Sequence, residues 1–240
     1  MYKFGRENAK LKNLMPYLPN FLRYIGNHGK PSLYTFSKLS GHHCPFAKEC
    51  LSKAIETPNG MRIQDGQHTK FRCFSASQEI IFPNVYASRK HNSELTKGKN
   101  VGQLRELIRQ SLPADGNVFR IHIGGDFINQ ADFDAWMMTA IDNPNRLFYA
   151  YTKSLPFWIA RQRDIPANFV LTASYGGWKD SLIAEHSLRF CNVVHNPAET
   201  TMPIDHDDSL ACNPMYRRSF SLLLHGTQPV GNRVAEHGYS

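Results

Sequence analysis

Three of the five cysteines of this 240-residue chain lie close together in its first third. Cys44 and Cys50 are separated by five residues, and Cys73 follows in a segment rich in glycine, proline and polar residues, where thiols are not needed for packing. Thiolates are preferred ligands of zinc and of iron–sulfur clusters. The sequence therefore predicts a metal centre on these three residues, with a [4Fe–4S] cluster as the first interpretation and zinc as the alternative.

The fourth ligand of this centre is not fixed by the spacing. Three thiolates leave one position for a histidine, another cysteine, water or a substrate, and the candidates in the chain are Cys212, Cys191, His42 and His43. Cys212 lies in a polar stretch and is the favoured fourth ligand, whereas Cys191 lies in an apolar stretch and is expected to pack in the core. The alternative to a shared centre is three unrelated reduced thiols.

The composition describes a basic globular protein. Lys and Arg number 28 against 20 Asp and Glu, a formal net charge of +8, and 41% of residues are hydrophobic. A positive field favours nucleic acid as a partner, although the charge forms no dense tract and also fits a basic protein without such a partner. No apolar run approaches the roughly 18 residues of a membrane span, and the polar start has no signal-peptide pattern. We expect a cytoplasmic protein with reduced thiols and no membrane partner.

The elements that must position these residues follow from periodicity. Residues 1–40, broken by three prolines, are expected to be a lead-in, and residues 41–240 a single domain whose cysteine segment is 41–76. Helical periodicity runs from about 77 to 112. Strands are then expected at 118–123, 147–151, 168–172, 190–194 and 219–224, alternating with helices at 131–141, 157–163 and 180–186. This alternation predicts an α/β fold with a largely parallel sheet or a partial (β/α) barrel.

Chemically capable residues follow the ends of these strands. The glycine pair Gly124 and Gly125 with Asp126 follows the first strand, Lys153 the second and His225 the last. In parallel folds that edge binds ligands, so Asp126, Lys153 and His225 are candidate catalytic residues, and the Gly-Gly-Asp run is a candidate ligand site. Polar turns also end any strand, and Asp126 has the alternative role of capping the next helix.

Two further stretches admit more than one interpretation. Residues 203–209 hold three carboxylates and a histidine, which suit a divalent cation or a cationic group, and we favour a solvated acidic turn. Tyr149 and Tyr151 beside Lys153 could stack a base or pack within the sheet. The chain contains no P-loop, zincin helix or nucleophile-elbow motif.

Several runs together resemble the phage gene product 88 family. They are residues 41–50, 71–74, 120–127, 149–154 and 224–229, and the resemblance extends from about residue 33 to the C-terminus. It implies a protein encoded by a phage or mobile element and acting in the host cytoplasm. It does not imply a particular activity.

The order of motifs is also similar to that of radical-SAM enzymes. That similarity implies that the three cysteines hold a [4Fe–4S] cluster, and that Gly124, Gly125 and Asp126 face the methionine part of S-adenosylmethionine in an enzyme acting on a nucleotide or nucleic acid. The chain departs from the CX3CX2C spacing common in those enzymes. The alternative function is a non-enzymatic phage protein that binds nucleic acid and carries a structural zinc or iron–sulfur site.

Alanine substitution of the cysteines tests this metal assignment. We expect Cys44→Ala, Cys50→Ala and Cys73→Ala each to lose bound metal, because each removes one thiolate ligand, while Cys191→Ala keeps it. Metal analysis of protein purified without oxygen measures the outcome. Full metal content in all three variants would contradict the assignment.

Overall fold

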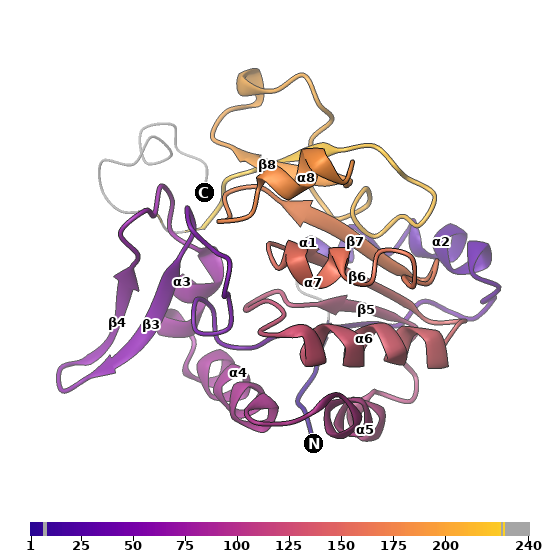
Figure 1. The fold of residues 1–240 in the computed structure, drawn as a ribbon, viewed down its shortest axis with the longest axis horizontal. Coiled ribbons are helices and arrows are strands. Elements are labelled where there is room, and N and C mark those ends of the chain that lie inside the picture. Colours follow the sequence, from indigo (N-terminus) through magenta and orange to yellow (C-terminus); the bar gives the residue numbers. More distant parts are fainter. Residues whose placement is uncertain (7–8, 227, 229–240) are drawn as a thin grey trace.

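The computed structural model describes residues 1–6, 9–226 and 228 (Figure 1). Seven strands form one sheet in the order β1-β2-β5-β6-β7-β8-β9, and two more form a hairpin. The strands of the sheet are β1 (Gly5–Arg6), β2 (Leu33–Phe36), β5 (Val118–Ile121), β6 (Leu147–Thr152), β7 (Phe169–Ser174), β8 (Phe190–Val194) and β9 (Phe220–Leu223), and the hairpin is β3 (Ser52–Thr57) with β4 (Gly60–Asp65).

The helices lie before and between these strands. Helices α1 (Ala9–Lys12) and α2 (Leu18–Tyr24) precede β2. Between β2 and β5 come α3 (Phe74–Ile81), α4 (Pro83–Thr96) and α5 (Val101–Ser111), and single helices α6 (Gln130–Asp142), α7 (Leu155–Ile159) and α8 (Ser181–Glu185) connect the next strands. A short 3-10 turn, η1 (Pro197–Glu199), follows β8.

Within the seven-stranded sheet, the strands from β2 to β9 are parallel and follow one another in chain order, and only β1 is antiparallel to its neighbour. This order confirms the predicted α/β class with a largely parallel sheet. When every crossover has the same hand and moves to the next strand, the connecting helices collect on one face of the sheet. Their apolar side chains accordingly share one core cluster with alternate strand residues.

Strand residues alternate between two separate cores. In β5, Phe119 and Ile121 pack beneath helices α5 to α8, whereas Val118 belongs to the cluster on the opposite face. Successive side chains of a strand point to opposite faces, so strands covered on both sides are apolar throughout. The opposite face is covered by α1 and α2 and by the segment around residues 210–216.

The first 40 residues contribute more to the fold than a lead-in would. They supply β1 and β2 of the sheet, and the buried face of α1 and α2 covers the second core. Between residues 11 and 22, five apolar side chains are almost completely buried: Leu11, Leu14, Leu18, Phe21 and Leu22. The two proline-broken helices are short, yet burial of an apolar face stabilises such helices where propensity does not.

Two regions are more finely divided than the sequence pattern indicated. The cysteine segment contains the β3–β4 hairpin, and the helical region from 77 to 112 is three helices, interrupted by Pro83 and by a turn around Gly98. Proline cannot donate its amide to the preceding turn, and Gly98 adopts a φ of 67°, so a continuous helix is excluded at both points. Within the described residues, no helix is long and apolar enough to cross a membrane.

One buried ion pair joins β2 to the helical layer. Lys38 follows β2, is fully buried, and its Nζ pairs with the carboxylate of Asp132 in the first turn of α6. The backbone amide of Lys38 donates to the carbonyl of Gly124 at 2.9 Å, and Asp132 also accepts from the amide of Ile128 at 3.1 Å. The pair therefore fixes the ends of β2 and β5 relative to α6.

Removing one partner of this pair should destabilise the protein strongly. We expect Lys38→Met to lower the free energy of unfolding by about 3–5 kcal/mol, because Asp132 would be left as an unpaired buried charge. Urea unfolding followed by circular dichroism measures this. The control is Arg105→Ala, which breaks the exposed Arg105–Asp142 pair and should leave the unfolding midpoint unchanged. Equal effects of the two substitutions would contradict the prediction.

Candidate functional site

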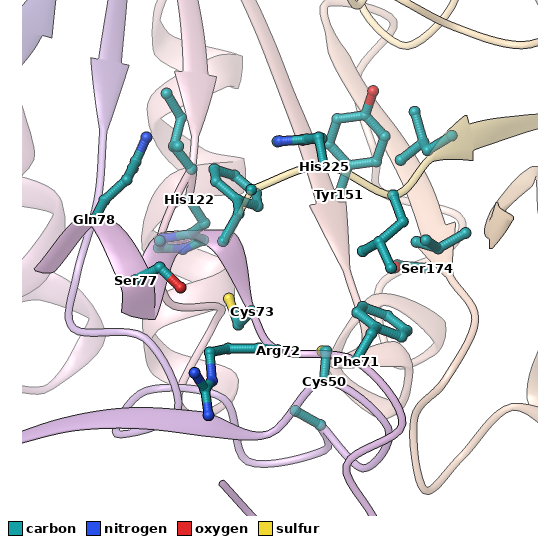
Figure 2. Close-up of a pocket in the computed structure, with 18 of the residues that line it drawn as sticks. Cys50, Phe71, Arg72, Cys73, Ser77, Gln78, His122, Tyr151, Ser174 and His225 are labelled. Carbon is teal, nitrogen blue, oxygen red and sulfur yellow. The ribbon is translucent and has the colours of Figure 1, made fainter. Parts of the chain in front are cut away.

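A cavity of about 730 Å³ opens at the carboxyl edge of the parallel strands. The sequence candidates Cys44, Cys50, Cys73, Gly124, Gly125, Asp126, Lys153 and His225 all line it. Figure 2 shows part of this lining, with Cys50 and Cys73 beside Phe71 and Arg72. Ligand-binding pockets commonly have this size and mainly apolar walls with a few polar groups. The structure thus brings together, at one edge, residues that are widely separated along the chain.

The three thiols come from two segments of the cysteine region. Cys44 and Cys50 lie in residues 37–51, which form neither helix nor strand, and Cys73 occupies the N-cap of α3. Burial raises the pKa of the Cys44 thiol well above its ordinary value, and the nearby carboxyl of Asp126 and the thiols of Cys73 and Cys50 add to the rise. Burial and Cys50 likewise raise the pKa of Cys73 to about 11. The three thiols therefore lie close enough to influence one another.

The loop that carries Cys44 is held by a glycine. Gly41 has a φ of 69°, and a Cβ atom there would lie 2.4 Å from the carbonyl oxygen of Ser52. The amide of Gly41 donates to the sulfur of Cys44 at 3.3 Å. Because any other residue would collide with the hairpin, glycine lets the loop pack directly against β3.

Hydrogen bonds attach this loop to the ends of β5 and β7. The amide of Asp126 donates to the carbonyl of His43 at 2.7 Å, and the amide of Glu49 donates to the carbonyl of Gly176 at 2.9 Å. Cys73 is held separately, because its amide donates to the hydroxyl of Ser52 at 3.3 Å. Backbone contacts of this kind position the thiols relative to the sheet.

The Gly-Gly-Asp run after β5 forms part of the cavity lining. Gly125 has a φ of 79°, and a Cβ there would lie 3.0 Å from Cβ of Lys38. The Asp126 carboxylate accepts from the hydroxyl of Thr152 at 2.7 Å and from the amides of Lys153 and Phe127, each at 2.8 Å. The alternative role of Asp126 as a helix cap is wrong, because Asn129 caps α6 by accepting from the amide of Asp132.

Lys153 and His225 are differently engaged. The ammonium group of Lys153 donates to the carbonyl and hydroxyl of Ser174, at 3.1 and 2.7 Å, and to the carbonyl of Tyr175. These three acceptors use the three N–H donors of the ammonium group, so Lys153 connects the end of β6 to the end of β7. The ring of His225 packs 4.5 Å from that of Phe74, next to Cys73. The remainder of the predicted motif after β9 includes Thr227 and Pro229, which lie outside the described residues.

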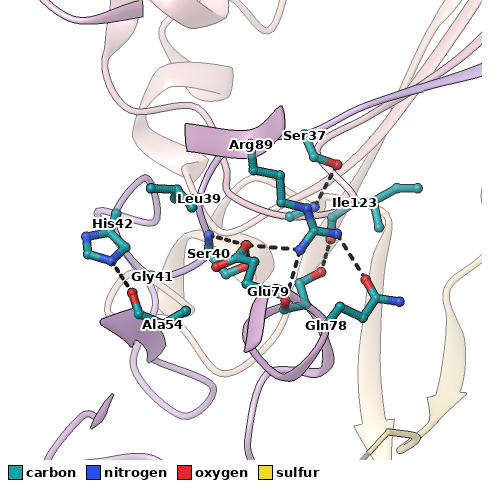
Figure 3. A network of polar contacts seen from close by, with 12 residues as sticks. Ser37, Leu39, Ser40, Gly41, His42, Ala54, Gln78, Glu79, Arg89 and Ile123 are labelled. Carbon is teal, nitrogen blue, oxygen red and sulfur yellow. Dashed lines mark hydrogen bonds and ion pairs between the residues drawn. The ribbon is translucent and has the colours of Figure 1, made fainter. Parts of the chain in front are cut away.

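A buried polar network fixes α3 behind the thiols (Figure 3). Arg89 of α4 donates to the Glu79 carboxylate and to the carbonyl of Ser75, each at 2.9 Å, and to the side chain of Gln78 at 3.0 Å. Glu79 also accepts from the amide and hydroxyl of Ser40, at 2.9 and 2.8 Å. The network joins α4, α3 and the loop before Cys44, so it sets the position of Cys73 relative to that loop. No local sequence pattern indicated it.

The candidate fourth ligands lie apart from the cavity wall. Cys212 and Cys191 are both completely buried in the core beneath α1 and α2, and neither lines the cavity. Cys212 sits in a polar stretch of sequence, but that stretch folds over the sheet and buries its thiol. His42 contacts the carbonyl of Ala54 through Nε2 at 3.0 Å, and His43 is buried. Among the described residues, no three His, Cys, Asp or Glu side chains are placed to bind a single metal ion.

The acidic stretch 203–209 is not a solvated turn. Asp205 and Asp208 are almost fully buried, and Asp208 accepts charge-assisted bonds from Arg120 at 2.7 Å and Lys10 at 3.0 Å. Burial alone would raise the pKa of Asp208, but these two cations hold that pKa below its usual value. Tyr149 donates its hydroxyl to the same carboxylate at 3.1 Å. Sequence reasoning missed this group, since its members are dispersed along the chain.

Comparison with protein-family models identifies the family of this chain. The model of the family described as Gene product 88 matches residues 3–237. The chain belongs to the gene product 88 family. This match confirms the resemblance found in the motifs and extends it to nearly the whole chain. No curated protein and no solved structure matches the chain. The comparisons give no support to the radical-SAM similarity, which therefore stays a proposal.

His122 is a buried titratable group at the end of β5. It has a φ of 60°, and its ring packs against Phe127 at 4.6 Å and Phe36 at 5.7 Å. Neither ring nitrogen has a hydrogen-bond partner among the described residues. Burial lowers the pKa of His122 well below its ordinary value, and the charge of Lys38 lowers it further. The folded protein therefore keeps this imidazole neutral.

This neutral histidine should make the protein acid-sensitive. Its folded pKa lies below its unfolded value of about 6.5, so only the unfolded chain takes up the proton in that window, and stability falls as the pH falls below about 6.5. The slope is at most about 1.4 kcal/mol per pH unit for this group. Urea midpoints at pH values of about 7.5 and 5.5 measure the loss, which His122→Phe should reduce. An unchanged pH dependence in that variant would contradict the assignment.

Proposed function

We propose that this gene product 88 protein binds a [4Fe–4S] cluster through Cys44, Cys50 and Cys73. The observation that supports it is that all three cysteines line a single cavity, together with the Gly-Gly-Asp run. Three cysteines leave one iron without a protein ligand, and an open iron can bind a small molecule. With Cys212 buried in the core, this fourth position belongs to a ligand in the cavity.

The chemistry of the donor set fits a cluster. A buried thiol with a raised pKa stays protonated on its own, and a cationic centre supplies the charge that stabilises the thiolate. Each thiolate of a cubane cluster binds its own iron, so the sulfurs need only surround a common volume. Zinc, with Zn–S distances of about 2.3 Å, requires its sulfurs to converge on one point. A zinc site would thus need the two cysteine segments to move closer together.

The cavity also accommodates S-adenosylmethionine as the ligand of the open iron. Asp126 borders the cavity, and its carboxylate accepts three hydrogen bonds within the protein. A carboxylate offers about four acceptor positions, so one remains for the ammonium group of the ligand. The neighbouring glycines have no side chains and let the ligand approach the backbone.

The reaction class that follows is radical-SAM-type modification of a nucleotide or nucleic acid. When bound and reduced, the cluster supplies electrons singly to the ligand on its open iron. Reductive cleavage of S-adenosylmethionine to methionine and 5′-deoxyadenosine consumes two electrons and one proton in all, and dithionite can supply the electrons in vitro. The protein's own residues bind and orient the ligand and exclude water from it.

Contact with nucleic acid is supported by the surface beside the cysteine loop. Trp178 is half exposed, with the ammonium group of Lys48 at 4.9 Å from its ring and the ring of His68 at 5.1 Å. Exposed aromatic rings flanked by cations stack bases and attract phosphates. The same feature favours the second candidate function, a non-enzymatic nucleic-acid-binding protein in which the metal centre is a structural element.

Anaerobic purification tests the proposed function. We expect brown protein with broad absorbance at about 400 nm and about four irons per chain. Cys44→Ser, Cys50→Ser and Cys73→Ser should each lose the colour, whereas Cys191→Ser, a buried cysteine outside the cavity, should keep it. Reconstituted protein should bind S-adenosylmethionine and release 5′-deoxyadenosine with dithionite.

The outcomes separate the two candidate functions. Colourless protein that contains zinc and binds DNA or RNA with a steep salt dependence would favour the non-enzymatic function. Protein that contains neither iron nor zinc, even after anaerobic reconstitution, would rule out the metal centre altogether.

A further inference from the structure

The cavity has a second polar wall, formed by residues other than the thiols. Lys10, Arg120, Tyr151, Asp205 and His225 line this part of the cavity. In Figure 2, Tyr151 and His225 lie together in the upper part of the view, and Cys50 and Cys73 lie below them. A molecule in the cavity can therefore contact the thiol wall at one end and this second wall at the other.

The formal charges of the second wall balance. Lys10 and Arg120 are its two cations, and both pair with the buried carboxylate of Asp208. Asp205 provides a second carboxylate. Asp208 does not line the cavity, but together with Asp205 it balances the two cations, so the wall does not select an anion such as a free phosphate, and a neutral polar group fits it better.

Two polar atoms of this wall are buried without partners. The Nε–H of Arg120 is a donor, and Oδ1 of Asp205 is an acceptor, and neither has a hydrogen bond among the described residues. The other oxygen of Asp205 accepts from the amide of Ala211 at 2.8 Å, which fixes the orientation of the carboxylate. Buried polar groups are almost always paired, so an unpaired donor and an unpaired acceptor on residues that line one cavity call for a ligand that offers the reverse pattern.

The aromatic side chains that line the cavity favour a planar ligand. Aromatic rings of Tyr151, Phe71, Phe74 and His225 contribute to its lining. The guanidinium of Arg120 lies over the ring of Tyr151, 5.3 Å from its centroid. Enzymes that accept a base into a pocket hold it between such rings and recognise its hydrogen-bonding edge with polar side chains. An amino-acid zwitterion would leave these apolar walls without a complementary surface.

We propose that this wall recognises the lactam edge of a nucleobase, with Arg120 donating to the ring carbonyl and Asp205 accepting from the adjacent ring N–H. Guanine, uracil and thymine carry this edge. Adenine and cytosine have a ring nitrogen acceptor where those bases have the ring N–H. The inference rests on the proposed function in placing the nucleotide in the cavity that the thiols share. It adds the substrate class to that function.

Calorimetric titration of the purified protein with nucleosides tests the inference. Guanosine and thymidine should bind about tenfold more tightly than adenosine and cytidine, the discrimination of one bidentate pair. Asp205→Asn replaces the acceptor with an amide donor, so it should weaken guanosine binding about tenfold and strengthen cytidine binding, because cytosine offers the adjacent acceptors O2 and N3 to the two donors. The control is Asp207→Asn, which makes the same change two residues away, outside the cavity lining, and should leave all four affinities unchanged.

Two results would overturn the inference. One is equal binding, or no binding, of the four nucleosides to the wild-type protein, a measurement that needs no variant to fold. The other is unchanged base preference in folded Asp205→Asn protein. Iron content and S-adenosylmethionine binding are measured on the same preparations. If the protein forms the cluster but does not discriminate among nucleosides, only this inference is contradicted. If it discriminates among nucleosides but forms no cluster, only the proposed function is contradicted.

Discussion

Asp126 makes the contacts on which the geometry of the cavity depends. Its amide binds the carbonyl of His43, beside Cys44, and its carboxylate holds Thr152 and the amide of Lys153 at the end of β6. One residue thus joins the cysteine loop, β5 and β6. A buried carboxylate must be satisfied by donors, and here all of those donors belong to segments that form the cavity. The position of Cys44 relative to the sheet therefore depends on the pairing of this one buried group.

Three further buried ion pairs connect segments around the cavity. Lys38 with Asp132 and Arg89 with Glu79 lie behind the Gly-Gly-Asp run and α3, and Arg120 with Asp208 lies on the opposite face of the sheet. Burying an ion pair costs desolvation energy that apolar residues would avoid, so such pairs contribute more to a defined geometry than to stability. Arg120 lines the cavity itself, and the other two pairs fix segments that carry lining residues.

Much of the sheet and part of the site could be predicted from the chain. Five strands, including β5 and β6, lie where apolar runs end in glycine or polar turns, because strands covered on both faces are apolar throughout. Strand β2 and the β3–β4 hairpin were not predicted, since short strands between loops have no distinct periodicity. Cys212 was expected at the metal centre but lies in the core, because a polar stretch folded over the sheet still buries individual side chains.

The sequence alone determined the α/β alternation and the grouping of three thiols in one segment, because both depend on local spacing. Only the tertiary structure decided that Lys10, Arg120, Tyr151 and Asp205 share a wall with one another and a cavity with those thiols. Strand periodicity specifies which face a side chain occupies, but it carries no information about the segment that covers that face. The covering segment is set when α1 and the acidic stretch close over the sheet, where Asp208 pairs with both Lys10 of α1 and Arg120 of β5.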